Sequence, residues 1–314
     1  MLKNERLNVY FLINKGLHLL DFAGPVQTLQ EASERGAPID IHYVGFENNV
    51  LSHQGLYINN ITQPPKEIGT QSIVIVTASH YHEKIYSDKS SQKSIEWLLS
   101  LKAERVLIVG ICTGSFLLAK AGLLDEKKCT CHHSLRRVME RKFPNIKFVP
   151  DCIFVEDDNI ITTAGVTAGL DLTLELIERY FDFDLSLTVA RDLVIHRRRM
   201  SNDPQLSIHL QYRNHISPLV HEVQDFIQKN YTLRISQNNM AIKFNVTLRH
   251  LQRVFKKYTG VTIHQYICLH RVEHARKIMK NGYGLEYAAH SSGFPNSNSL
   301  KDYLAKYTDN QDIS

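Results

Sequence analysis

A cysteine stands between two glycines in the pattern Gly110-x-Cys112-x-Gly114, directly after an apolar run. Flanking glycines permit a tight strand-to-helix turn that holds the central side chain off the end of a sheet, the geometry of a nucleophile elbow. A helix that starts at Ser115 would point its N-terminal dipole at the sulfur and favour the thiolate. A small buried cysteine in a glycine-rich turn fits the pattern equally well, because the surrounding sequence identifies no base.

A second feature with chemical potential is the stretch of residues 240–257, which predicts two short helices around a tight turn. Asn245 lies at the turn, where it tolerates a left-handed backbone better than most residues other than glycine. Thr247 is a good N-cap for the second helix. The apolar stripe of that helix, recurring at helical spacing, consists of Leu248, Leu251, Val254 and Phe255.

The opposite face of this second helix is basic and rich in hydrogen-bonding groups, which suits the DNA major groove. Arginine and glutamine can read base edges there, while lysine binds phosphates. An ordinary amphipathic helix with a solvated basic face is the alternative interpretation. The candidate DNA-binding residues are Thr247, Arg249, His250, Gln252, Arg253, Lys256 and Lys257.

The same pattern recurs near the C-terminus, which favours the DNA-binding interpretation. Residues 289–294 repeat the pattern of residues 241–246, and residues 263–280 between the copies read as one long helix. The second recognition helix, near residues 296–306, offers no arginine, so we expect it to bind DNA more weakly or to read fewer bases. Its candidate DNA-binding residues are Asn296, Asn298 and Lys301.

Charge is unevenly distributed along the 314 residues. Residues 201–314 hold 14 Lys and Arg against eight Asp and Glu, a net charge of +6, whereas the remainder has a net charge of −1. This asymmetry is typical of a phosphate-binding module attached to a near-neutral one.

Composition bounds the class of protein and its compartment. The apolar share of 43% is enough for packed cores, and no apolar run is long enough to span a bilayer. The N-terminus leads into a strand without a signal-peptide core, and five cysteines without framework spacing fit a reducing compartment. We therefore expect a cytoplasmic protein. We predict no metal and no cofactor, because Cys129-x-Cys131-His132-His133 lacks a second ligand pair at finger-like spacing.

Apolar segments with strand character alternate with helical segments over the first 195 residues. This order predicts an α/β sandwich with a largely parallel sheet, followed by an all-α domain with two helix-turn-helix units. We expect domains at 1–195 and 217–314, with a linker at 196–216. The expected strands are 7–13, 39–44, 72–76, 105–109, 147–149, 153–155 and 160–162. The expected helices of the first domain are 21–33, 91–101, 115–121, 135–142, 170–180 and 185–195.

The C-terminal part, from about residue 219, resembles the DNA-binding domain of the AraC family of transcription regulators. The resemblance rests on residues 248–257, on the Gly260-Val261-Thr262-Ile263 phrase, on residues 271–276 and on Gly293-Phe294. It implies two helix-turn-helix units joined by a linker helix, which bind double-stranded DNA.

Residues 5–195 resemble the PfpI-type branch of the class I glutamine amidotransferase-like superfamily. The phrases that carry the resemblance are 109–125, 129–132, 161–171 and Asp21-x-x-Gly24-Pro25. Isocyanide hydratases of this branch use the elbow cysteine as nucleophile, and their roles would map to Cys112 and Asp21, with His132 as the usual neighbour. The resemblance thus implies that the α/β sandwich is of the flavodoxin-like, glutamine amidotransferase-like type. It also implies a ligand site at Asp21, Cys112, Thr113 and His132.

Two departures from that branch weigh against catalysis. Thr77-Ala78-Ser79 stands where the branch often has Pro-Gly-Gly, whose backbone helps to form an oxyanion site, and His133 stands where it often has Trp. In the GlxA-like arrangement, where this domain precedes an AraC module, it is taken to sense a small molecule and to dimerise. We therefore expect a sequence-specific transcription regulator that is not an enzyme, a homodimer with an amino acid or amine as effector.

Two alternatives for Cys112 stay open. In the first, Cys112 is catalytic, and the chain is a cysteine-dependent hydratase or amidase of a small nitrogenous compound, tethered to DNA by its tail. Otherwise, Cys112 would be a redox sensor whose thiolate is oxidised to the sulfenate and changes the affinity for DNA.

Overall fold

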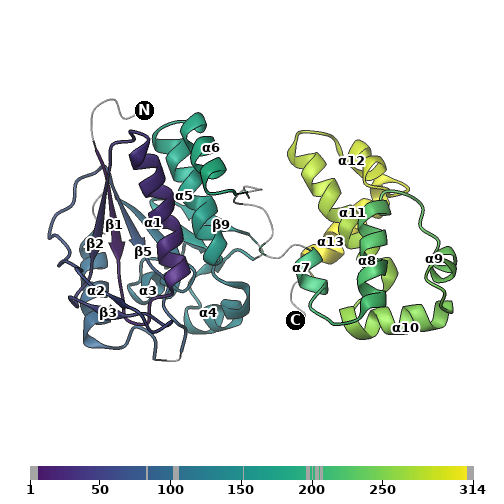
Figure 1. Ribbon diagram of the computed structural model, residues 1–314, viewed down its shortest axis with the longest axis horizontal. Coiled ribbons are helices and arrows are strands. Elements are labelled where there is room, and N and C mark those ends of the chain that lie inside the picture. Colours follow the sequence, from purple (N-terminus) through teal and green to yellow (C-terminus); the bar gives the residue numbers. More distant parts are fainter. Residues whose placement is uncertain are drawn as a thin grey trace. The chain divides into compact units, whose positions relative to one another are not determined.

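The computed structural model describes residues 6–82, 84–101, 106–150, 152–195, 199, 201, 205 and 208–309. The chain divides into two compact units, residues 1–205 and 206–314 (Figure 1). Among the described residues, no helix is both long enough and apolar enough to cross a membrane.

A six-stranded sheet in the order β2-β1-β5-β6-β10-β9 forms the centre of the N-terminal unit. All neighbours pair in parallel except the edge strand β9, which runs antiparallel to β10. The strands are β1 (Leu7–Leu12), β2 (Ile39–Val44), β5 (Ser72–Val76), β6 (Leu107–Ile111), β9 (Phe154–Asp157) and β10 (Ile160–Thr163). The predicted largely parallel sheet is confirmed.

Four short strands lie outside this sheet. They form two pairs, β3 (Val50–Leu51) with β4 (Tyr57–Ile58), and β7 (Lys128–Cys129) with β8 (Lys147–Phe148). The strand predicted at residues 147–149 therefore exists, but it pairs with β7 instead of joining the main sheet. The β3–β4 hairpin was not predicted, because two-residue strands leave no periodic pattern.

Helices cover both faces of the sheet. On one face lie α1 (Leu19–Glu34), α5 (Val166–Tyr180) and α6 (Phe183–Asp192); on the other lie α2 (Lys89–Ser100), α3 (Gly114–Lys120) and α4 (Arg136–Lys142). Strand β5 illustrates why both faces need a cover, because successive side chains of a strand point to opposite faces of the sheet. Ile73 and Ile75 enter the core beneath α1 and α5, while Val74 and Val76 enter the core beneath α2 and α3. Both faces of β5 are buried, as its unbroken apolar run predicts.

The C-terminal unit is helical and has two small cores that share one helix. Its helices are α7 (Ile208–Tyr212), α8 (Pro218–Asn230), α9 (Gln237–Lys243), α10 (Leu248–Thr259), α11 (Ile263–Lys280), α12 (Leu285–Ser291) and α13 (Ser297–Asp309). Tyr266 of α11 packs in a core with α8, α9 and α10, whereas Val272 and Ala275 of α11 pack with α12 and α13. Two helix-turn-helix units joined by a linker helix are thus confirmed.

Several described residues of the expected linker, 196–216, are bonded to one unit or the other. Arg199 pairs with Asp171, its Nε lying 2.8 Å from Oδ2, and Gln205 donates to the carbonyl of Cys131 at 3.0 Å. The short helix α7 also falls in this range, although the sequence indicated no helix there. Residues 196–198 and 202–204 lie outside the described residues, and the domain limits stay a prediction.

Candidate nucleic-acid interface and thiol site

The turn between α9 and α10 has the conformation that its sequence predicts. Asn245 adopts a φ of 53°, in the left-handed region. The chain reverses through two backbone hydrogen bonds, from Asn245 N to Ile242 O at 3.1 Å and from Val246 N to Ala241 O at 3.0 Å. Ala241 is buried, so the helix packs closely at this point.

The turn between α12 and α13 repeats this geometry with glycine in the left-handed position. Gly293 has a φ of 88°, and Phe294 N donates to Ala289 O at 2.9 Å, as Val246 N donates to Ala241 O in the first turn. A Cβ on Gly293 would lie 2.5 Å from the carbonyl oxygen of Thr232, so this turn also needs glycine for close packing. The internal repeat read from the sequence is confirmed at the level of single hydrogen bonds.

Helix α10 is capped at both ends and buries one side. The Thr247 hydroxyl accepts a hydrogen bond from His250 N at 3.2 Å, which confirms Thr247 as the N-cap. Gly260 ends the helix in the left-handed conformation, with a φ of 76°. Leu251 and Phe255 are fully buried, whereas Leu248 and Val254 are partly buried against the same core.

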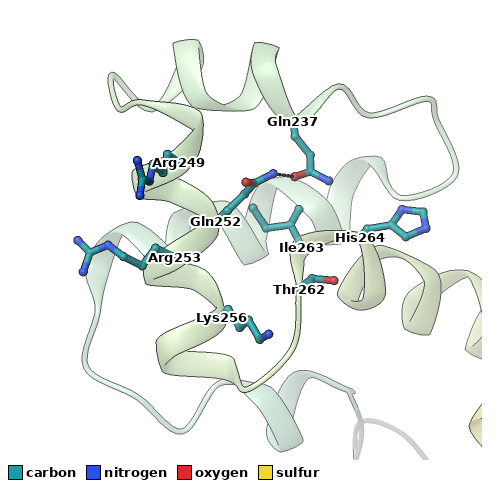
Figure 2. Close-up of a pocket in the computed structure, with 8 residues that line it drawn as sticks. All are labelled: Gln237, Arg249, Gln252, Arg253, Lys256, Thr262, Ile263 and His264. Carbon is teal, nitrogen blue, oxygen red and sulfur yellow. Dashed lines mark hydrogen bonds between the residues drawn. The ribbon is translucent and has the colours of Figure 1, made fainter.

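The other side of α10 is solvent-exposed at every predicted DNA-binding position from Thr247 to Lys257. None of the ion pairs found among the described residues involves Arg249, Arg253, Lys256 or Lys257. In Figure 2, Arg249 and Arg253 project from the same side of α10. Cations without carboxylate partners on one helix face are suited to bind phosphates and base edges.

A groove of about 550 Å³ runs along this face and reaches the start of α11 (Figure 2). Gln252 donates to Gln237 Oε1 at 2.9 Å, so the neighbouring helix α9 orients this glutamine. Sequence reasoning missed the lining residues that come from α9 and α11, because only the packing of three helices brings them together. The groove is lined by Gln237, Arg249, Gln252, Arg253, Lys256, Thr262, Ile263 and His264.

The second recognition helix, α13, differs from α10 in its polar face. Asn298 and Lys301 are exposed, as predicted. Asn296 is exposed too, but its side-chain oxygen accepts a hydrogen bond from Ser299 N at 2.9 Å. Asn296 therefore occupies the capping position that Thr247 has in α10, and its carboxamide oxygen is already bonded to the helix end.

The predicted nucleophile elbow is present in the N-terminal unit, between β6 and α3. Cys112 adopts a φ of 51°, a conformation that few non-glycine residues adopt. A Cβ on Gly114 would lie 2.3 Å from the carbonyl oxygen of Val76, and one on Gly110 would lie 2.8 Å from the Leu118 side chain. Gly114 is thus required by close packing against backbone, whereas a side chain at Gly110 would have to displace the end of the Leu118 side chain.

The environment of Cys112 disfavours the thiolate, in contrast to the expectation from the helix dipole. Burial, with the nearby Asp21 carboxyl as a second cause, raises the pKa of Cys112 to about 12. Helix α3, whose dipole was expected to favour the thiolate, is only seven residues long. Asp21 is itself fully buried, its carboxylate oxygens have no hydrogen-bond partner among the described residues, and burial raises its pKa to about 7.

The other two predicted ligand residues are engaged elsewhere. The Thr113 hydroxyl accepts from Ser79 N at 2.9 Å and donates to Ser79 O at 2.6 Å. His132 Nδ1 lies 2.8 Å from the Ser134 hydroxyl. His132 is not among the groups that shift the pKa of Cys112, which are Asp21 and the Thr113 backbone. The structure therefore brings Asp21 and Cys112 together, but it gives Cys112 no imidazole base among the described residues.

The fold and these sites define a two-unit protein in which an α/β unit with a nucleophile elbow precedes a double helix-turn-helix unit. The sequence profile of the DJ-1/PfpI family matches residues 7–179, more than half of the chain, and that of a helix-turn-helix domain matches residues 240–310. The chain belongs to the DJ-1/PfpI family, and its C-terminal unit is of the AraC type.

Curated relatives of the chain include transcription regulators and an enzyme. The chain is 31% identical over 170 residues to the HTH-type transcriptional regulator GbdR of Pseudomonas aeruginosa, covering 54% of this chain and 46% of that protein. It is 26% identical over 276 residues to the regulator CdhR of the same species, covering 86% and 80%. It is 25% identical over 190 residues to an isonitrile hydratase of Pseudomonas putida, covering 60% and 78%. The match thus spans less than half of GbdR.

Proposed function

We propose that the chain is a transcription regulator that binds specific double-stranded DNA through its C-terminal unit. The observation that carries this proposal is the exposed face of α10, where Arg249, Arg253 and Lys256 lie along one groove without carboxylate partners in the described structure. The net charge of +6 on residues 201–314 supports the same conclusion, because phosphates attract such a surface. The likeness to CdhR, which covers 86% of this chain, is in keeping with it.

In this function α10 enters the major groove with Arg253 and Gln252 directed at base edges and the lysines at phosphates. Helix α13 occupies the next major-groove segment on the same face of the duplex, about 10 base pairs away. Helix α13 contributes less to specificity than α10. Of its three predicted DNA-binding residues, Asn298 and Lys301 are exposed to DNA, whereas Asn296 caps the helix.

The N-terminal unit senses a small molecule and pairs two chains in a homodimer, in the cytoplasm. The sensing site is the region around Asp21, Cys112, Thr113 and His132, at the carboxyl ends of parallel strands, where ligands of α/β sheets usually bind. The family resemblance suggests an amino acid or amine. An ammonium group would pair with the buried Asp21 carboxylate, which has no hydrogen-bond partner in the described structure.

A titration of the full chain against a pool of genomic fragments, at several salt concentrations, tests the DNA-binding function. Selection of a discrete fragment, with affinity that falls steeply as salt rises, is the expected result. Equal and weak binding to every fragment would reduce the C-terminal unit to a non-specific tether and contradict the proposal.

A cysteine-dependent hydratase or amidase is the second candidate, favoured by the elbow geometry and by the likeness to an isonitrile hydratase. Two observations weigh against it: the Cys112 pKa is about 12, and the Ser79 amide that an oxyanion would need is bonded to Thr113. The Cys112→Ser variant separates the two functions. An enzyme would lose turnover of a small nitrogenous compound, whereas the proposed regulator has no such turnover to lose.

A further inference from the structure

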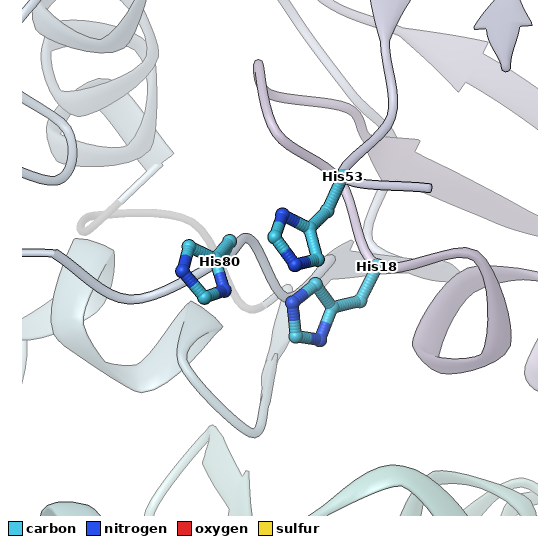
Figure 3. Close-up of side chains that lie close together, drawn as sticks. All are labelled: His18, His53 and His80. Carbon is cyan, nitrogen blue, oxygen red and sulfur yellow. The ribbon is translucent and has the colours of Figure 1, made fainter. Parts of the chain in front are cut away.

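Three histidines from distant parts of the sequence meet at one end of the N-terminal unit (Figure 3). His18 precedes α1, His53 lies in the β3–β4 hairpin, and His80 follows β5. One ring nitrogen from each lies within 4.8 Å of the others. Over the described residues, no other group of three or more His, Cys, Asp or Glu side chains meets as closely.

The backbone holds these three segments together. Each histidine amide donates to a carbonyl in the segment that carries another of the three. The bonds run from His18 N to Ala78 O at 2.9 Å, from His53 N to Leu17 O at 2.8 Å and from His80 N to Gly16 O at 2.9 Å. A cluster fixed in this way loses little backbone entropy when it binds a ligand, which is the condition for a preorganised site.

The three imidazole rings lie against one another. Those of His53 and His80 stack with centroids 3.8 Å apart and an interplanar angle of 2°, and the His18 ring lies 5.1 Å from that of His53. Rings this close together can each offer one ligand nitrogen to a single ion. The neutral imidazole is the form that binds metal ions.

His18 also has a carboxylate behind it. Its Nδ1 lies 3.5 Å from Oδ2 of the fully buried Asp21, whereas its Nε2 is buried and has no hydrogen-bond partner among the described residues. In Figure 3 one nitrogen of His18 points toward the other two rings. Histidines that bind metals commonly turn their second nitrogen to a carboxylate in this way, which orients the ring and raises its basicity.

We propose that His18, His53 and His80 bind one divalent transition-metal ion, such as Zn²⁺, and leave one coordination position open. Imidazole ligands suit zinc, copper and nickel, and three protein ligands are typical of open zinc sites. With Zn–N distances of about 2.0–2.1 Å, the ligand nitrogens of a tetrahedral site are about 3.4 Å apart. The rings of His53 and His80 are exposed and can rotate into this geometry.

The proposed site differs from the sequence-based prediction of no metal. The spacing of the three histidines in the sequence resembles no metal motif and therefore did not indicate a site. Only the positions of α1, the β3–β4 hairpin and the end of β5 bring them together.

Zinc binding to the full chain, purified without a histidine tag, tests the site. Calorimetric titration with zinc chloride is expected to give one site per chain at the histidine cluster. The double variant His53→Ala, His80→Ala is expected to lose that site. Its affinity for zinc should fall by more than the roughly 10–100-fold that removal of an outer-shell partner costs. The matched control is the variant His133→Ala. His133 is exposed, and the centroid of its ring lies 4.4 Å from that of His132. This variant should bind zinc like the wild type.

Two results would overturn the proposal. One is the absence of zinc binding to the wild-type chain at micromolar concentrations. The other is wild-type stoichiometry and affinity in the double variant; release of that zinc on cysteine alkylation would assign it to the thiols. Melting of each variant without metal reports its folding, and His80→Ala alone carries the test if the double variant melts earlier.

Discussion

The substitution Gly293→Ala tests the packing that positions the second helix-turn-helix unit. Gly293 forms the turn before α13 with a φ of 88°, and an added Cβ would lie 2.5 Å from Thr232 O and 2.9 Å from the carbonyl carbon and Cα of Thr232. All three contacts are with backbone, which cannot rotate away as a flexible side chain can. Gly282, also with a φ of 88°, has nothing within 4 Å of its Cβ position, so Gly282→Ala is a matched control.

The two variants share one cost and differ in another. An alanine in the left-handed region costs about 1–2 kcal/mol at either position. Forcing a methyl group against backbone in a packed site adds about 1–3 kcal/mol, and only Gly293→Ala has this contact. We therefore expect Gly293→Ala to lower the free energy of unfolding by roughly 2–5 kcal/mol, and Gly282→Ala by about 1–2 kcal/mol.

Urea unfolding followed by far-UV circular dichroism measures the helical C-terminal unit together with the rest of the chain. Fluorescence of Trp97, the single tryptophan, follows the N-terminal unit and should have the same midpoint in both variants. Equal midpoints of the dichroism transition in the two variants would refute the reasoning, because the Thr232 contact would then carry no energy.

Three further predictions follow from single contacts. Iodoacetamide should alkylate Cys112 far more slowly in the folded chain than in urea at pH 8, because a folded-state pKa of about 12 keeps the thiol protonated. The alkylation rate of the folded chain should keep rising above pH 9, where the rate of the unfolded chain levels off. Complete labelling within minutes at pH 7 would contradict this. Thr113→Val should destabilise the chain by about 1–3 kcal/mol in urea unfolding, since the buried Ser79 amide loses its acceptor; an unchanged midpoint would mean that water replaces the hydroxyl. Leu251→Ala should cost about 2–5 kcal/mol in the dichroism transition and weaken DNA binding, as this fully buried side chain fixes α10; normal stability would place the side chain outside the core.

Local signals predicted the recognition helix because the relevant physics is local. The left-handed Asn245, the Thr247 cap and the spacing of Leu251 and Phe255 each act within one or two helical turns. The same holds for the elbow, where two glycines and one cysteine determine a single turn. Identifying α13 succeeded for the same reason, whereas the capping role of Asn296 was visible only in the structure.

Properties that depend on tertiary packing could not be predicted. The sequence indicated a dipole that favours the Cys112 thiolate, but only the fold shows how strongly the sulfur is desolvated. The bond between Thr113 and Ser79 joins the ends of two strands that are distant in the sequence. Gln237 and His264 reach the α10 groove from other helices for a similar reason.

The most direct test of the central claim compares the wild-type chain with Arg253→Ala and Arg141→Ala on the genomic fragment that the wild type selects. Arg141 is an exposed arginine on α4 in the other unit, so its loss changes the total charge equally. We predict that Arg253→Ala weakens binding by about 1–3 kcal/mol and relaxes base preference, with Arg141→Ala close to the wild type. Equal affinity and equal preference in all three chains would contradict the assignment of α10 as the recognition helix.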